Sequence, residues 1–103
     1  MTAQDIFEAI RSATGITQEQ ITGRSRKKEL VYARMFFVYY LNHSVLKSRI
    51  KRKNIIIGRL IGRDRNTIRH IADKAIIELK YNKVYKRQFD VVNDCLIQES
   101  GTS

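Results

Sequence analysis

The sequence contains no proline among its 103 residues and only five glycines, so few residues in it would interrupt a helix. Apolar residues recur at every third or fourth position, which is the period of an α-helix with one buried face. The clearest run follows Asp64, a residue type that caps helices. We therefore predict an all-α, compact helical domain of about five to six helices. The apolar stripe after Asp64 consists of Ile68, Ile71, Ala72, Ala75, Ile76 and Leu79.

The same period predicts further helices. Two of the helix starts show the spacing of a capping box, Thr2 with Asp5 and Thr17 with Gln20. The short helix after Thr17 is expected to be an elbow outside the core. The expected ranges are Ala3–Ala13, Thr17–Ile21, Glu29–Leu46 as the central core helix, Ile55–Ile61 with Asn54 as its N-cap, and Val84–Leu96 with Tyr85, Phe89, Val92 and Leu96 facing inward.

Length and composition limit the function classes. A chain of this length supports one compact core, so we predict a single domain over 1–97 and a disordered tail over 98–103. No apolar run approaches the ~20 residues of a membrane span and no signal peptide is evident, so we expect a cytoplasmic protein. The lone Cys95 forms no internal disulfide, and with only His43 and His70 it makes no zinc set. Paired carboxylates, a catalytic triad and a phosphate loop are missing, so we expect neither enzyme activity nor a cofactor.

The positive charge is large and concentrated in the middle of the chain. Twenty Lys and Arg against ten Asp and Glu give a net charge of +10, more than a small domain needs for solubility. Between Arg24 and Lys74 there are fifteen basic residues and three acidic ones. This distribution predicts a polyanionic partner and favours nucleic acid, with a heparin-like polymer or an anionic membrane as alternatives.

Residues 55–80 have the pattern of a helix-turn-helix: a short apolar helix, a turn at Gly62, and a longer helix whose exposed face is polar and basic. A helix is ~10–12 Å across and the major groove of DNA is ~12 Å wide, so the first turns of the second helix can lie against base edges. Amphipathic helix pairs joined by a glycine are also common in ordinary helical domains, and the charge distribution favours DNA binding. We predict a recognition helix from about Asp64 to Lys80.

The exposed side of that helix carries residue types that read DNA. Arg65 and Asn66 can hydrogen-bond bidentately to guanine and adenine edges, and Thr67 can bind a base or contact a thymine methyl. Arg63 is placed for a phosphate contact. His70 lies one turn after Asn66 and is either a base or phosphate contact or a surface histidine.

Two other basic segments are candidates for DNA contact. Arg24 and Arg26 lie on a segment that begins at Gly23, and such arms can enter a narrow minor groove; the alternative is an ordinary charged loop. The stretch KSRIKRK at 47–53, which includes Lys51, has five basic residues in seven. It is a phosphate-binding segment or a solvated linker, and it either extends the preceding helix or forms a loop.

Two stretches resemble one known family. SRKKELVYARMFFVYYL resembles the opening of the C-terminal DNA-binding domain of the bacterial replication initiator DnaA, and IGRLIGRDRNTIRHIADK resembles the signature helix-turn-helix of that domain. With the closing segment KRQFDVV, the similarity covers about residues 3–96. The resemblance implies a DNA-binding domain of the stand-alone type found in phages or mobile elements, because the ATPase module of the initiator has no counterpart in this sequence.

The resemblance also implies roles by position. Arg26, and secondarily Arg24, would form a minor-groove arm, and Arg34 would contact a phosphate. Arg63 and Asp64 would set the turn and the start of the recognition helix. Arg65, Asn66 and Thr67 would be the base-reading triplet. His70 and Lys74 would be further groove or backbone contacts.

The sequence departs from the family pattern at several of these positions. A single glycine, Gly62, precedes the Arg-Asp pair where the initiators usually have two. The usual His-Thr-Thr or His-Ser-Thr is Arg-Asn-Thr at 65–67, and a usual glutamine after the core-helix arginine is Met35. The basic connector is several residues longer. We therefore expect the target site to differ from the DnaA-box nonamer.

These observations predict sequence-specific binding of double-stranded DNA, without nucleotide or membrane, in replication control or transcription. They do not determine the oligomeric state, for which a monomer is favoured. One alternative is a DNA-coating protein that binds without sequence preference. Another is a protein-interaction module that targets a host initiator, and RNA binding ranks below both. The interaction module is suggested by aromatic residues that exceed what one small core is expected to hide, namely Tyr32, Phe36, Tyr39 and Tyr40.

Overall fold

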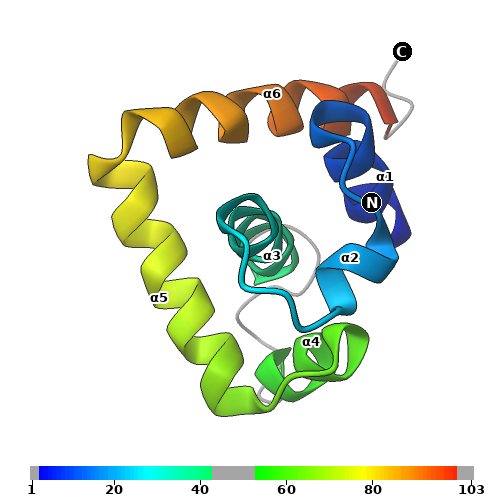
Figure 1. The fold of residues 1–103 in the computed structure, drawn as a ribbon, viewed down its shortest axis with the longest axis vertical. Helices are drawn as coiled ribbons and strands as arrows, with labels where there is room; N and C mark the ends of the chain where they lie inside the picture. Colours follow the sequence, from blue (N-terminus) through cyan, green and yellow to red (C-terminus); the bar gives the residue numbers. More distant parts are fainter. Residues whose placement is uncertain (1–2, 43–52, 100–103) are drawn as a thin grey trace.

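Six α-helices form the part of the chain that the computed structural model describes, residues 3–42 and 53–99, and no strand occurs in it. Figure 1 shows one helix, α3, at the centre and the other five around it. The predicted all-α fold is confirmed. None of the described helices is long and apolar enough to cross a membrane. In chain order the helices are α1 (Ala3–Thr14), α2 (Gln18–Thr22), α3 (Lys28–Tyr40), α4 (Lys53–Ile61), α5 (Arg65–Tyr81) and α6 (Lys83–Glu99).

The central helix α3 has almost no solvent-facing side. Nine of its thirteen residues are buried, which explains why the sequence is apolar in nearly every direction around it. Phe37 stacks on Phe7 of α1 with ring centroids 4.2 Å apart. Phe36 stacks on Tyr85 of α6 at 4.8 Å. The core is therefore built around α3, with aromatic contacts to both the first and the last helix.

The aromatic residues of α3 that suggested a partner surface belong to this core. Tyr32, Phe36 and Tyr40 are buried, and Tyr39 packs edge-on against Phe89 with centroids 5.3 Å apart. The five helices around α3 provide enough interior for these rings. The argument for a protein-interaction module was that they could not all be buried, so it loses its basis.

Local hydrogen bonds start α2 and α5 where the sequence predicts. Thr17 and Gln20 form the capping box, in which Gln20 Oε1 accepts from the Thr17 amide at 2.9 Å and Thr17 Oγ1 accepts from the Gln20 amide at 3.3 Å. Asp64 caps α5 by accepting from the Thr67 amide at 2.7 Å. The short helix α2 is more than an elbow, because its Ile21 is fully buried in the core.

Two predicted boundaries are wrong. The described part of α4 begins at Lys53, so Asn54 is already helical and is not the N-cap. The helix α6 continues to Glu99, so residues 98–99 are helical although we predicted them in the tail. The parts of our predictions that lie outside the described residues are the capping role of Thr2, the end of the core helix at 43–46, the connector 47–52 with Lys51, and the tail 100–103.

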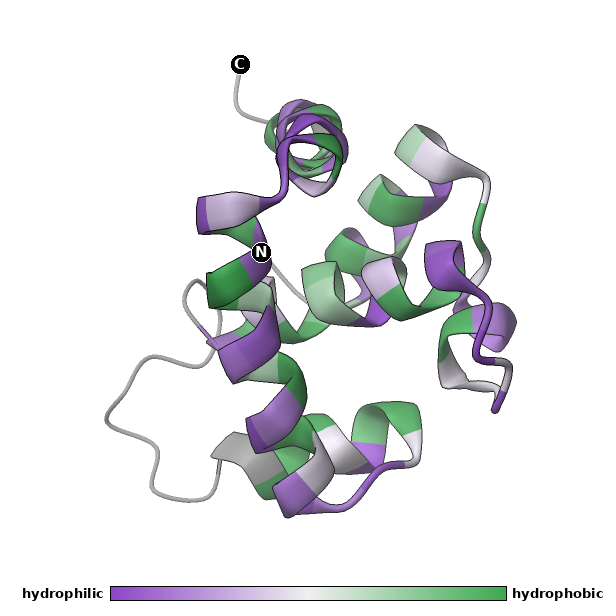
Figure 2. Ribbon diagram, turned by 60° about the vertical axis from the view of Figure 1, so that its left-hand side comes forward, coloured by the Kyte–Doolittle hydropathy of each residue, from purple (hydrophilic) through white to green (hydrophobic). Residues whose placement is uncertain are grey.

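The core-facing stripe of α5 is narrower than predicted. Ile68 and Ala75 are fully buried and Ala72 nearly so, but Ile76 is 50% exposed. Successive helix residues are separated by about 100°, and α3 and α4 cover only the side that carries Ile68, Ala72 and Ala75. Figure 2 shows hydrophilic and hydrophobic residues alternating along the helices, as expected for helices that bury one side.

The first and last helices pack closely against each other, as Figure 1 shows. Ile6 and Ile10 of α1 are fully buried, and so are Val92 and, almost completely, Leu96 of α6. This contact closes the ring of helices around α3. It lies on the other side of the domain from the turn between α4 and α5.

Candidate nucleic-acid interface

A tight turn joins α4 to α5. Gly62 has φ 68°, a left-handed conformation that glycine adopts without steric cost. The Arg63 amide donates to the Gly58 carbonyl at 2.8 Å, the bond that ends a helix in a Schellman motif. Asp64 then caps α5, and the hydrogen bond from the Thr67 amide lowers the pKa of the Asp64 carboxyl below its usual value. The turn therefore has a defined geometry at each of its residues.

Gly58 allows this turn to approach α4. A Cβ atom at position 58 would overlap the carbonyl oxygen of Arg63 and lie 3.2 Å from its carbonyl carbon. It would also be 3.5 Å from Cγ1 of Ile68 in α5. Sequence reasoning gave Gly58 no role, because the contact depends on how the chain folds back and no local pattern marks it.

The exposed face of α5 carries the predicted base-reading residues and the further predicted groove or backbone contacts. Of the base-reading residues, Arg65 and Asn66 are exposed and Thr67 is half-buried. The further contacts His70 and Lys74 are also exposed. Asn66, His70 and Lys74 are each four positions apart, so they lie in a row along one side of the helix. The row starts at the capped N-terminus of α5, where backbone amides favour anions.

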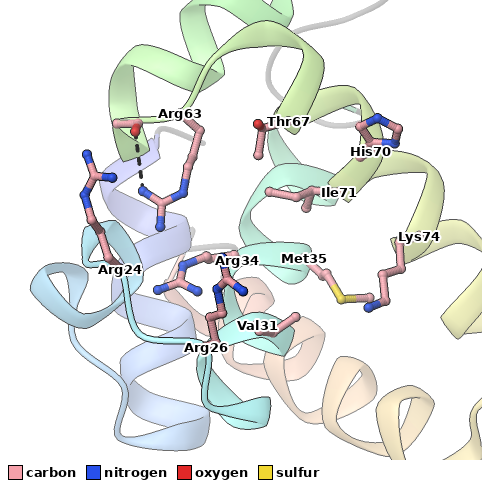
Figure 3. Close-up of a pocket in the computed structure, with 11 residues that line it drawn as sticks. Arg24, Arg26, Val31, Arg34, Met35, Arg63, Thr67, His70, Ile71 and Lys74 are labelled. Carbon is pink, nitrogen blue, oxygen red and sulfur yellow. Dashed lines mark hydrogen bonds between the residues drawn. The ribbon is translucent and has the colours of Figure 1, made fainter.

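A groove of about 490 Å³ lies beside this row, between α5, α3 and the loop that joins α2 to α3 (Figure 3). The loop contributes Arg24 and Arg26, which lie across the groove from α5. From α5 come Thr67, His70 and Lys74. The apolar part of the lining consists of Val31, Met35 and Ile71.

The lining of this groove has one sign of charge. It includes four arginines and one lysine and no acidic residue. A concave surface with one sign of charge concentrates the electrostatic potential and attracts polyanions. The groove brings together seven of the predicted contact residues: Arg24, Arg26, Arg34, Arg63, Thr67, His70 and Lys74. Arg65 and Asn66 lie outside the lining, on the first turn of α5.

Arg34 lies deeper than the phosphate contact implied by the resemblance. It is 6% exposed, and its guanidinium donates four hydrogen bonds to backbone carbonyls. Burial, together with the nearby guanidinium of Arg63, lowers the pKa of Arg34. Most of its donors are therefore directed at the protein. The carbonyls belong to Gln20, Ile21, Gly23 and Ser25, at N···O distances of 3.4, 2.8, 2.8 and 2.7 Å.

Arg63 also binds backbone carbonyls. Its Nη1 donates to Ile61 at 3.0 Å and to Gly62 and Thr22 at 3.4 Å. Its Nη2 donates to Gly23, which Arg34 also contacts. The bonds of Arg34 and of Arg63 to this loop are not recognisable from the sequence, because they join residues far apart along the chain. Arg63, for example, is 40 residues from Gly23.

The structure does not place every predicted residue. Lys51 lies outside the described ranges, so its expected phosphate contact remains a prediction. Within residues 3–42 and 53–99, no group of His, Cys, Asp and Glu is arranged to hold a metal ion.

Comparison with known proteins is consistent with this geometry. Residues 3–75 match the family model described as the bacterial dnaA protein helix-turn-helix. The whole chain aligns with the chromosomal replication initiator protein DnaA of Herpetosiphon aurantiacus, with 31% identity over 104 residues. The chain spans 18% of the length of that relative. No solved structure matches the chain significantly.

Proposed function

Because this chain belongs to the bacterial DnaA helix-turn-helix family, we propose that it binds double-stranded DNA at a specific sequence. In this proposal α5 is the recognition helix, and the loop over residues 23–27 is a minor-groove arm. The observation that carries it is the basic groove, which has Arg24 and Arg26 on one side and the polar row of α5 on the other. The binding acts in replication control or transcription.

The first turns of α5 would read bases in the major groove. Arg65 and Asn66 are exposed there and match the hydrogen-bonding edges of guanine and adenine. Thr67 is half-buried beside them and reaches a base or a thymine methyl group. The apolar side of α5 stays on the core, as a recognition helix requires.

The groove between the arm and α5 suits a phosphate strand. In a duplex a sugar-phosphate strand separates the minor groove from the major groove, so a protein that enters both must accommodate that strand in between. Lys74 and His70 line the groove from α5, opposite Arg24 and Arg26. Their contacts would set the position of the duplex and would carry no base information.

The base-reading role is tested by Asn66→Ala. A target is first selected from a random duplex pool, and affinity is then measured on the selected and on a scrambled duplex. We expect a loss of roughly 1–3 kcal/mol on the selected duplex and almost none on the scrambled one. An equal loss on both duplexes would contradict base reading by Asn66.

The position of the phosphate strand is tested with two matched lysines of α5. Lys74 lines the groove, whereas Lys80 lies in the last turn and does not line it. We expect Lys74→Ala to reduce the slope of log affinity against log salt by about one, and Lys80→Ala to leave it unchanged.

If wild-type protein shows no preference for any selected sequence at any salt concentration, it is a DNA-coating protein.

A further inference from the structure

Two guanidinium groups bind the C-terminal end of α2. The last carbonyls of a helix have no partners within the helix and carry partial negative charge, so they attract hydrogen-bond donors and cations. Here each carbonyl from Gln20 to Gly23 accepts a hydrogen bond from Arg34 or Arg63. We call these two arginines the arginine clamp.

The arginine clamp connects three separate parts of the chain. Arg34 extends from the core helix α3, and Arg63 extends from the turn between α4 and α5. Both donate to the Gly23 carbonyl, and Arg34 also binds the carbonyl of Ser25. The backbone is therefore fixed on both sides of Arg24, at the base of the arm that lines the groove.

We propose that Arg34 and Arg63 are positioning residues, which hold the arm at a fixed distance and orientation from α5 so that both enter one duplex together. This inference rests on the proposed function, and it replaces the phosphate contact as the main role of Arg34. An arm that is already ordered costs less conformational entropy on binding than a free loop, so the arginine clamp increases affinity through the arm.

The geometry of the guanidinium group is essential to this role. Arginine carries five N–H donors in a planar fork, and Arg34 uses them on four carbonyls. A lysine has one ammonium group that cannot reach four carbonyls spread over this loop. Arg34→Lys therefore keeps the charge and removes most of the bonds, which separates positioning from electrostatics.

The closing experiment is a double-mutant cycle on the selected duplex. We expect Arg34→Lys to weaken specific binding by roughly tenfold in the wild-type background, the size of one lost base-edge contact. In the Arg26→Ala background the same substitution should weaken binding by less than twofold, because the residue that it positions is gone. In the Asn66→Ala background the full tenfold effect should return, because Asn66 reads bases from α5 independently of the arm.

A second measurement uses the free protein. We expect the ¹⁵N heteronuclear NOE of amides 24–26 to fall in Arg34→Lys and to stay unchanged along α5. Thermal unfolding of each variant identifies global destabilisation, which would lower every NOE and every affinity together. If Arg34→Lys does not fold, Arg63→Lys provides the same cycle, because Arg63 is less buried and binds the same Gly23 carbonyl.

The outcomes separate the two proposals. Equal effects of Arg34→Lys with and without Arg26, or unchanged order of the arm, would overturn the positioning role. A reduction of the salt slope by about one in Arg34→Met, equal in both backgrounds, would show that Arg34 contacts a phosphate directly. Absence of any selected sequence for the wild-type protein would instead reject the proposed function itself.

Discussion

Gly58→Ala is expected to destabilise the domain although alanine is the better helix former. The substitution is in α4, where replacing glycine by alanine would normally stabilise a helix by about 1 kcal/mol. Here the new methyl group would overlap the Arg63 carbonyl oxygen, and the carbonyl carbon lies 3.2 Å away. The neighbour is backbone, which cannot move aside as a flexible side chain does.

The magnitude follows from two losses. Forcing a methyl group into packed backbone costs about 1–3 kcal/mol, and moving the turn away stretches the 2.8 Å bond from the Arg63 amide to Gly58, a further ~1 kcal/mol. After subtraction of the gain in helix propensity, we expect a net loss of about 2 kcal/mol. For a domain of this size that is a decrease in Tm of roughly 10 °C.

The assay is urea unfolding at 25 °C, followed by circular dichroism, with thermal unfolding alongside. The matched control is Gly62→Ala, where φ is 68° and nothing lies within 4 Å of a new Cβ atom. There we expect only the conformational penalty of alanine in the left-handed region, a loss of ~1–2 kcal/mol in the free energy of unfolding. Gly62→Asn should recover part of that loss, and Gly58→Asn should not. A Gly58→Ala protein as stable as wild type would refute the claim that α4 and the turn touch here.

Two further predictions concern buried and capping groups. The ring of Tyr85 is fully buried, and its hydroxyl has no hydrogen-bond partner among the described residues. Burial raises the pKa of this hydroxyl. Because Tyr85→Phe removes a buried polar group that makes no hydrogen bond, it should increase the free energy of unfolding by about 1 kcal/mol. The matched substitution Tyr40→Phe should lower the free energy of unfolding by a similar amount, because Tyr40 Oη donates a hydrogen bond to Asn93 Oδ1 at 3.2 Å. Equal effects of the two substitutions in urea unfolding would contradict this prediction. The hydrogen bond from the Thr67 amide lowers the pKa of Asp64 in the folded state. The ionised carboxylate therefore stabilises the domain at pH values above the pKa of an aspartate in the unfolded chain, about 4. This contribution is lost as the pH falls through the lowered pKa of the folded state. Asp64→Asn should therefore be less stable than wild type at pH 7 and converge with it in unfolding experiments below pH 4; a constant difference would argue against the ionised cap.

The sequence predicted what depends on neighbours a few residues apart. The capping box at Thr17 and the cap at Asp64 both involve residues three positions apart, so their hydrogen bonds could be inferred before folding was considered. The buried positions Ile68, Ala72 and Ala75 followed from the helical period. Ile76 was assigned wrongly because the period indicates which residues share a side, and the width of the covered side depends on the helices packed against it.

The parts of the site that come from distant segments could not be predicted from periodicity. Arg34 occurs in an apolar row of α3, and the carbonyls that it binds lie 9 to 14 residues earlier. The tight approach at Gly58 depends on a turn that only forms in the folded chain. The family resemblance predicted that the arm and α5 act together, and it implied a phosphate contact where the structure shows bonds to the protein backbone.

The contact between α1 and α6 shows that the domain needs more of the chain than the family model covers. The family match ends at residue 75, before α6 begins. Yet α6 supplies Tyr85, which stacks on Phe36 of the central helix, and it covers α1 with Val92 and Leu96. A chain that ended at residue 75 would contain every proposed base contact and would leave one side of α3 open to water. Although α6 carries no proposed DNA contact, it buries the core helix α3 from which the DNA-binding surface is built.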